Sequence, residues 1–410
     1  MSRYHLIIFS SILLLWWLSC QKSNDQEIIL STWKKSKGIP GNLVIIYPQK
    51  GTLFPPEIAA PTIIWRDQSS NVKNWFISVT VNGENELLSA FTEQNQWKPD
   101  LIQWEKIKRQ GLEHDVHITV LGYKGRRIVS GANTIIRTSG DSVKAAIFYR
   151  AVPLPFKYAL EHLEQIRWHL GDISSTQPSP ALLQNLPLCG NCHSFTPDGK
   201  TLAMDIDYAN DKGSYVISPI ARETILTADK IITWSDYRRE DGEMTFGLLS
   251  QISPDGRYVA STVKDRSIFV AKDGLDYSQL FFPIKGIIAI YDRQTKKFFS
   301  LPGADDPAYV QSNPTWSPDG KYIYFAKAPV YHSPEAEKSR DIVLPTAVAA
   351  EFIEGKRDFK YDIYRIPFNQ GKGGKPEPIA GASNNGMSNF FPRISPDGKW
   401  LVFTQAKNFM

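Results

Sequence analysis

Four copies of one turn motif limit what this chain of 410 residues can fold into more than any other sequence feature. Each copy reads Ser or Thr, Pro, Asp, Gly, and the four aspartates are Asp198, Asp255, Asp319 and Asp397. Ser or Thr at the first position, Pro at the second and Gly at the fourth favour a type I turn. Apolar, β-forming residues flank every copy, so each one predicts a β-hairpin.

The spacing of the four copies predicts sheets arranged as the blades of a β-propeller. The motif aspartates are 57, 64 and 78 residues apart. A minimal four-stranded blade needs about 40–45 residues, so the copies must be separated by insertions. The apolar runs 287–291 and 361–366 are candidates for third strands.

The repeats resemble those of the TolB family of periplasmic proteins. The resemblance rests on Ser-Pro-Asp-Gly followed by Lys or Arg and alternating apolar residues, and it covers residues 186–410. It implies a β-propeller in which the segment before each motif is the innermost strand and begins at the central channel. Four or five blades are expected, the last one incomplete, because the final copy lies close to residue 410. Truncation relative to the family is favoured over completion of that blade by a strand near residue 180.

The first 20 residues predict a lipoprotein signal peptide. Arg3 precedes an almost unbroken apolar run from Leu6 to Leu18, which is too short for a comfortable membrane span. The run ends in Leu18-Ser19-Cys20, which resembles the lipobox of bacterial lipoproteins, although Trp17 stands where that family usually has Leu. The resemblance implies a lipid on Cys20 and a bacterial cell-envelope location, periplasmic or surface-facing. Ordinary secretion with cleavage nearby is the alternative.

The region before the repeats predicts a tether, a β-sandwich and a linker. Residues 21–41 are polar and weakly patterned. Residues 42–152 contain short runs with a period of two and no helical pattern, and Trp75, Ile77, Val79 and Val81 fall on one strand face. This all-β pattern is similar to a fibronectin type III or immunoglobulin-like sandwich. Residues 153–185 are expected to form a helical and loop linker, with a short helix between Tyr158 and Leu170.

Cys189, Cys192 and His193 carry the spacing used for covalent attachment of a c-type haem. Two thiols would form thioether links, and the imidazole after the second thiol would coordinate iron from one side. Gly190 permits the tight turn between the two sulfurs. The motif leads directly into the first propeller repeat, so the sequence predicts a haem at the channel mouth.

Other interpretations of the same pair stay open. Outside the cytoplasm, Cys189 and Cys192 can form a structural disulfide, with His193 incidental. A zinc site needs further Cys or His ligands, and no second Cys-x-x-Cys exists. A thioredoxin-like role favours a helix start, whereas this motif precedes a predicted strand.

The sequence also offers candidates for a second axial ligand of the iron. Met387 and Met244 lie ten and eleven residues before the motif aspartates Asp397 and Asp255. Both are therefore expected in loops at the face where His193 lies. Met387, in a loop with no packing pattern, is the first candidate and Met244 the second. Ordinary packing is the alternative for both, since Met often fills gaps.

The remaining features exclude some function classes and leave others open. The net charge of +5 and the absence of a basic run interleaved with aromatics argue against nucleic-acid binding. No hydrolase or transferase motif is present, and His114 and His117 lack a nearby third ligand. The acidic stretch from Asp205 to Gly213 is expected to form an outer hairpin turn. The chain is interpreted as an envelope lipoprotein with haem c, acting in electron transfer or small-ligand sensing with a redox partner. The alternative is a non-catalytic scaffold that binds an envelope protein or a glycan.

Overall fold

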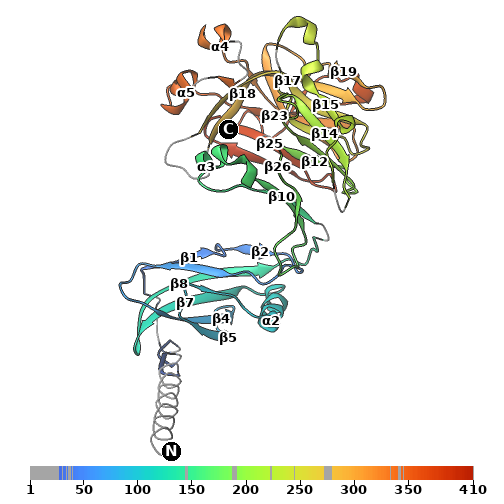
Figure 1. The fold of residues 1–410 in the computed structure, drawn as a ribbon. Coiled ribbons are helices and arrows are strands. Elements are labelled where there is room, and N and C mark those ends of the chain that lie inside the picture. Colours follow the sequence, from blue (N-terminus) through green and yellow to red (C-terminus); the bar gives the residue numbers. More distant parts are fainter. Residues whose placement is uncertain are drawn as a thin grey trace, which may run out of the picture. The chain divides into compact units, whose positions relative to one another are not determined.

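The chain is all-β, and it divides into two compact units (Figure 1). The computed structural model describes residues 27–29, 31–33, 35, 38, 40–143, 146–186, 192–221, 224–243, 245–271, 279–332, 334–339, 343–344 and 346–409. The first unit contains residues up to Ile147 together with Leu170–Pro180, and the second contains Phe148–His169 and Ala181 onward. The predicted signal peptide and Cys20 lie outside the described residues.

The first unit is a sandwich of two sheets. The larger sheet has the order β2-β8-β7-β4-β5 and the smaller has the order β1-β3-β6. The strands are β1 (Leu43–Tyr47), β2 (Thr52–Phe54), β3 (Ile63–Asp67), β4 (Asn74–Val81), β5 (Asn85–Thr92), β6 (Gln96–Trp97), β7 (Val116–Lys124) and β8 (Arg127–Thr138). Trp75, Ile77 and Val79 are buried against Ile63 and Trp65 of the facing sheet, so the predicted inward face of this strand is confirmed.

A helix that the sequence pattern did not predict closes one side of the sandwich core. It is α2 (Leu101–Gly111), which begins at a capping box between Asp100 and Gln103. Trp104 and Ile107 are buried in the core, whereas Leu101 is 71% exposed. The exposed apolar residues at its start blur the helical periodicity, and the capping pair is the signal that would have found it.

The segment before the repeats forms a three-stranded sheet and short helical turns. The sheet has the order β11-β10-β9, from β9 (Ile147–Ala151), β10 (Arg167–Gly171) and β11 (Ala181–Leu183). Between β9 and β10 lie α3 (Phe156–Glu161) and a 3-10 turn at Leu163–Gln165. The expected helix between Tyr158 and Leu170 is therefore shorter, because residues 167–170 pair as a strand with β11.

Four further sheets follow, and each begins with one of the predicted hairpins. The first contains β12 (His193–Phe195), β13 (Thr201–Asp205), β14 (Ser214–Pro219) and β15 (Ile231–Thr233). The second contains β16 (Leu248–Ile252), β17 (Tyr258–Ala271), β18 (Gln279–Asp292) and β19 (Lys297–Ser300), with β22 (Val343–Leu344) beside β17. The third contains β20 (Tyr309–Trp316), β21 (Tyr322–Pro329), β23 (Asp362–Pro367) and β24 (Glu377–Pro378). The fourth pairs β25 (Ser388–Ile394) with β26 (Leu401–Ala406), and the helices α4 (Pro334–Lys338) and α5 (Thr346–Ile353) lie in the insertion of the third.

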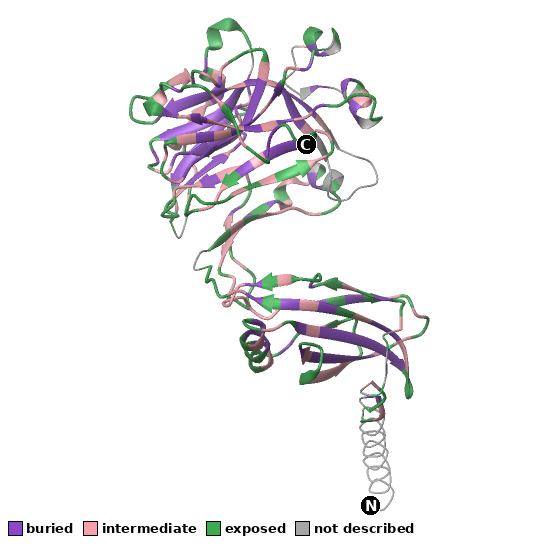
Figure 2. Ribbon diagram, turned by 180° about the vertical axis from the view of Figure 1, so that it is seen from behind, coloured by how far each residue is buried: buried purple, intermediate pink, exposed green. Residues whose placement is uncertain are grey.

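The sheets of the second unit are stacked radially, as in a β-propeller. The strand before each turn motif is the first of its sheet, and β12 lies beside β16, β16 beside β20 and β20 beside β25. Apolar residues fill the space between neighbouring sheets, for example Ala203 and Tyr215 against Val259 and Ala289. Figure 2 shows these buried strand faces within the unit.

The turn motifs owe their shape to the motif aspartate. Asp198 accepts hydrogen bonds from the Thr196 hydroxyl over 2.6 Å and from the Lys200 amide over 3.0 Å. These bonds lower the pKa of Asp198 below its usual value. Gly199 has a φ of +68°, which a residue with a side chain rarely adopts. The other three copies repeat this geometry, so the repeats were correctly predicted as hairpins.

Candidate functional site

Cys192 and His193 begin the innermost strand of the first propeller sheet. Cys189 lies outside the described residues, as do Gly190 and Asn191. The Cys192 carbonyl accepts a hydrogen bond from the Asp205 amide over 3.0 Å, which extends the β12–β13 pairing by one residue. The Cys192 side chain is partly buried. The second half of the predicted haem motif is thus held by regular strand pairing.

Cys192 occupies a special position within the repeat. Four residues before the Ser of the other motif copies stand Leu249, Asn313 and Phe391, with φ values of +61°, +54° and +51°. At each of these residues the register of the inner strand shifts against its neighbour. Cys192 stands four residues before Thr196, so it is the corresponding residue of the first copy.

The sulfur of Cys192 lies close to groups from two other strands. It interacts electrostatically with the Tyr215 hydroxyl of β14 and with the Arg393 guanidinium of β25, which belongs to the last sheet. Burial lowers the pKa of Arg393, and the nearby sulfur partly offsets this effect. The thiol therefore lies near the hydroxyl of Tyr215, a residue that is buried between the first and second sheets.

The His193 imidazole points to a different neighbourhood. It is partly buried, and it lies edge-on to Phe148 of β9, with 4.8 Å between the ring centroids. The Phe195 ring lies 5.9 Å away on the same strand face. Ser194 faces the other way, and its hydroxyl lies 3.3 Å from the Tyr215 hydroxyl. His193 thus faces the β9–β11 sheet, which contributes an aromatic wall.

Two carboxylates of the first and second sheets have raised pKa values, and Asp265 is buried whereas Asp205 is partly exposed. Asp205 ends β13, and its side chain interacts with Ser250 and Leu249 of the second sheet. Burial raises the pKa of Asp205 well above its usual value, and the charge of Asp265 adds to this effect. Burial also raises the pKa of Asp265, to about 6, although hydrogen bonds from Phe246, Gly247 and Thr245 oppose the rise.

Sequence reasoning did not identify these carboxylates. Asp205 stands seven residues after the motif aspartate, where the other copies have Thr262, Ala326 and Thr404. An aligned comparison of the four copies shows this single charged residue at a position that is otherwise small and uncharged. The stretch after it, from Tyr208 to Gly213, forms the β13–β14 turn, which confirms the expected outer turn.

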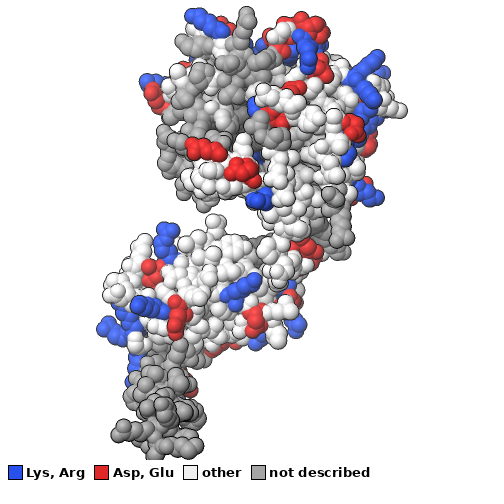
Figure 3. Space-filling model, in the orientation of Figure 1, with Lys and Arg blue, Asp and Glu red and all other residues white. Residues whose placement is uncertain are grey.

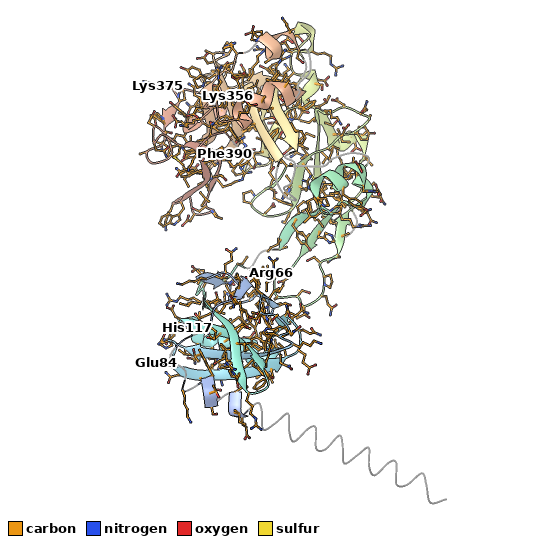
Figure 4. All side chains as sticks on the ribbon, turned by 90° about the vertical axis from the view of Figure 1, so that its left-hand side faces the viewer. Arg66, Glu84, His117, Lys356, Lys375 and Phe390 are labelled. Carbon is orange, nitrogen blue, oxygen red and sulfur yellow. The ribbon has the colours of Figure 1, made fainter. Side chains whose placement is uncertain are left out.

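The two candidate methionines can be placed in part. Met387 is partly exposed, and its carbonyl accepts a hydrogen bond from Asn389 over 3.3 Å just before β25. Phe390, which Figure 4 labels, anchors that strand in the core. Met244 lies outside the described residues. Its neighbour Glu243 is tied to Lys264 through the main-chain carbonyl over 3.0 Å.

Other polar groups do not assemble into a metal centre in the described part of the chain. No cluster of three or more His, Cys, Asp or Glu side chains with metal-binding geometry occurs there. His117 lies in the sandwich, where its ring faces the turn at Gly83 (Figure 4). On the face that Figure 3 shows, the described cationic and anionic side chains are interspersed rather than gathered by sign.

A separate cavity opens at the turn motifs. Its volume is about 1030 Å³, and it lies between the second and third motif copies. Tyr258, Trp316 and Phe368 supply an aromatic floor, and Arg257 and Asp319 supply charge at its edge. The cavity lining is more polar than apolar, with Asp255, Lys321 and Gln370 beside the aromatic rings.

Comparison with known proteins shows likeness in fold only. No family model matches the chain. No curated protein matches it either. An oligogalacturonate lyase in complex with manganese shares 10% sequence identity with this chain at a TM-score of 0.27. The aligned region covers 70% of this chain and 63% of the lyase chain. A GH74 enzyme of Niastella koreensis shares 9% sequence identity at a TM-score of 0.31. The aligned region covers 59% of this chain and 38% of the GH74 chain. A structure described as the eukaryotic initiation factor shares 10% sequence identity at a TM-score of 0.31. The aligned region covers 84% of this chain and 65% of the initiation factor chain. The chain spans less than two thirds of each of these three chains.

The described helices include none that is long and apolar enough to cross a membrane.

Proposed function

We propose that this protein is an envelope lipoprotein that carries one c-type haem and acts in electron transfer or small-ligand sensing. The haem would be bonded to Cys189 and Cys192 and ligated by His193. When bound, such a group supplies an iron centre that exchanges one electron or binds a small ligand. The observation that carries the proposal is the pairing of a partly buried Cys192 with a partly exposed His193 imidazole beside an aromatic wall.

Several of the described residues near His193 suit a haem bound there. The β12–β13 pairing fixes the backbone of Cys192 and His193, since Asp205 donates to the Cys192 carbonyl and His193 pairs with Met204. Phe148 and Phe195 supply apolar surface next to the imidazole. Apolar contacts and limited solvent access are levers by which proteins set haem potential.

Other residues suit roles around such a group. Arg393 brings a guanidinium near Cys192, and a guanidinium pairs well with the carboxylate of a haem propionate. Met387 is the first candidate for the second axial position and Met244 the second. The lipid on Cys20 would keep the protein at the membrane, and a redox protein of the envelope would be its partner.

The absorption spectrum tests this proposal. The chain with its leader is expressed in a bacterium that contains the periplasmic haem-attachment machinery, and the protein is purified and denatured. We expect a Soret band that stays with the polypeptide after acid–organic extraction. Replacing Cys192 by Ser weakens retention of the band, and replacing both Cys189 and Cys192 removes it. A wild-type protein without Soret absorbance under these conditions contradicts the proposal.

The second candidate function is a non-catalytic scaffold for a protein or a glycan, with a disulfide between Cys189 and Cys192. The observation that favours it is the aromatic and charged cavity at the turn motifs, because such a lining can hold a side chain or a sugar ring. This candidate predicts a colourless protein that alkylating reagents do not modify at Cys189 or Cys192 until a reductant is added.

A further inference from the structure

The fourth propeller sheet ends in an open strand edge. In each of the first three sheets, a third strand pairs antiparallel with the second strand. The fourth sheet repeats the same hairpin, but in the described part of the chain it contains only β25 and β26 (Figure 1). The strand nearest to residue 180 is β11, which pairs with β10 and so does not fill this edge.

One main-chain hydrogen bond shows where the third strand belongs. In the first three copies, the carbonyl of the residue after the motif Gly accepts this bond from the residue that follows the third strand. The bonds are 2.8–3.0 Å long and run from Ile220 to Lys200, from Arg293 to Arg257 and from Phe368 to Lys321. Lys399 is the corresponding residue of the fourth copy. Among the described residues, no main-chain amide donates to its carbonyl.

The pairing of β26 with β25 fixes which main-chain groups face outward. The Trp400 carbonyl accepts a hydrogen bond from the Ser395 amide over 2.9 Å, so the main chain of Trp400 faces β25. Successive residues of a strand direct their N–H and C=O groups to alternate sides. The groups of Leu401, Phe403 and Gln405 therefore face away from β25. They form the kind of ladder that β21 offers to β23 in the third sheet.

The sequence of β26 lacks the features that usually protect a free edge. The strand spans Leu401–Ala406 and contains no Pro, no Gly and no charged residue. Natural free edges are kept short or carry Pro or Lys. The outermost strands of the other three sheets follow this rule, because β15 has three residues, β19 begins with Lys297 and β24 has two residues and ends in Pro378. The composition of β26 is instead that of an inner strand, which indicates that another strand covers it.

The side chains around this edge indicate the chemistry of the partner. Trp400 is 71% exposed and Val402 is 65% exposed, and the two lie on one face because they are two residues apart. Lys399 and Lys407 are exposed at the two ends of the strand. Asp397 lies 3.8 Å from the Lys399 ammonium and balances part of that charge. The edge therefore suits an extended segment with apolar residues at alternate positions and acidic residues at its ends.

We propose that the outer edge of β26 binds an extended segment of another polypeptide as the third strand of the fourth sheet. The segment runs antiparallel to β26, as the third strands of the other sheets do, and main-chain hydrogen bonds supply much of its affinity. A second copy of the chain does not fit edge to edge. The strands β21 and β23 lie beside β25, and the third sheet continues outward to β24, so the third sheets of two copies would collide.

A designed peptide tests this edge on the full chain. The probe is Glu-Val-Thr-Val-Thr-Val-Glu with both ends blocked, and it is added to the protein while hydrogen exchange of residues 399–407 is followed by mass spectrometry. The same sequence is also joined to the C-terminus through a flexible Gly-Ser linker, which raises its local concentration to about millimolar. We expect slower exchange of residues 399–407 in both formats. A peptide with N-methylated inner amides cannot donate hydrogen bonds, and we expect it to have no effect.

Matched variants at Gln405 separate main-chain pairing from side-chain contact. Gln405→Pro removes an outward N–H, and Pro is tolerated at such a position of an edge strand. Gln405→Ala keeps the N–H and loses only the side chain, which donates to Asn389 over 2.9 Å. We expect Gln405→Pro to weaken peptide binding by about tenfold, because one hydrogen bond is lost and its acceptor stays unpaired. We expect Gln405→Ala to bind the peptide as the wild type does. Thermal unfolding without peptide checks that both variants fold.

Three outcomes overturn the proposal. The first is unchanged exchange of residues 399–407 with both the added and the tethered peptide. The second is equal binding of the peptide by the wild type and Gln405→Pro, or equal binding of the N-methylated peptide. The third is a concentration-dependent dimer in sedimentation that Gln405→Pro abolishes, which assigns the edge to a second copy instead. None of these readouts uses haem, so this surface and the proposed function stand or fall separately.

Discussion

The main-chain amide of Asp205 donates to the carbonyl of Cys192 over 3.0 Å, so this aspartate and the candidate haem cysteine are neighbours in one hairpin. The Asp205 side chain interacts with Ser250 and Leu249 of the second sheet. The sulfur of Cys192 lies near Tyr215 and Arg393. The first repeat therefore carries its unusual residues at one end of the hairpin, beside the inner strands.

Replacing His193 by Ala tests the proposed iron ligand. We expect covalent attachment to persist at a reduced level and the visible spectrum to shift, because the iron loses its proximal imidazole. His169→Ala is the matched control, since His169 is also a partly buried strand histidine that stacks on an aromatic ring, Tyr149, at 5.1 Å. Identical spectra for the wild type and His193→Ala contradict this ligand assignment.

The buried Asp265 predicts that stability falls as the pH rises. The pKa of Asp265 is about 6 in the folded chain, whereas its usual value is 3.8. As the pH rises, the folded state therefore keeps the proton up to a higher pH than the unfolded state does. Between pH 4 and pH 6 the free energy of unfolding should therefore decrease, by about 3 kcal/mol at most from this group. Urea unfolding at several pH values measures the slope. Asp265→Asn should flatten it, and an unchanged slope argues against this role.

The pair of Asp292 and Arg257 predicts the opposite dependence. Hydrogen bonds from Arg257, at 2.9 and 3.2 Å, lower the pKa of Asp292 to about 2. The contribution of this ion pair to folding stability is present above about pH 4 and is lost as the pH falls through 2. The reason is that the unfolded state binds the proton more readily than the folded state. Arg257→Ala should lower stability at pH 7 only slightly, since the guanidinium is partly exposed. The variant and the wild type should converge near pH 2, and a constant difference over this range would show that the loss is not electrostatic.

The helix of the sandwich offers a test of core packing. Trp104 is 1% exposed, and its indole N–H donates to the Ile58 carbonyl over 2.8 Å. Trp104→Ala should lower the free energy of unfolding by about 3–5 kcal/mol, as is usual for large buried aromatics. Leu101→Ala on the same helix should change it by about 0.5 kcal/mol or less, because Leu101 is 71% exposed. Chemical denaturation compares the two, and similar losses for both contradict the observed burial of the helix.

Two glycines with the same backbone φ allow the cost of backbone strain to be measured apart from the cost of steric crowding. Gly247 and Gly199 both have a φ of +68°. A Cβ on Gly247 would lie 2.1 Å from the Trp234 ring, whereas nothing lies within 4 Å of one on Gly199. Gly199→Ala should therefore lower stability by about 1 kcal/mol. Gly247→Ala should lower it much more and also disturb Asp265, to which the Gly247 amide donates. Equal losses in thermal unfolding would contradict the close approach at Gly247.

The repeats made most of the second unit predictable. The motif residues around Asp198 and its three equivalents define turns by local chemistry, and local chemistry can be read from sequence. The helix α2 was missed because its first turn exposes Leu101 and Ile102, which hides the amphipathic pattern. Asp265 was missed because its role depends on a shift in strand register beside Lys264 and on donors from a distant loop. Such contacts arise only when separate sheets are brought together.

The intact mass of the mature protein tests the central claim most directly. The chain is produced with its leader and the haem-attachment machinery, and its mass is compared with that of the protein in which Cys189 and Cys192 are both replaced by Ser. We predict that the wild type is heavier than its polypeptide mass by one haem and that the double variant carries none. A wild-type protein whose polypeptide mass is lower by two hydrogens, with no haem, would contradict the account and establish the disulfide instead.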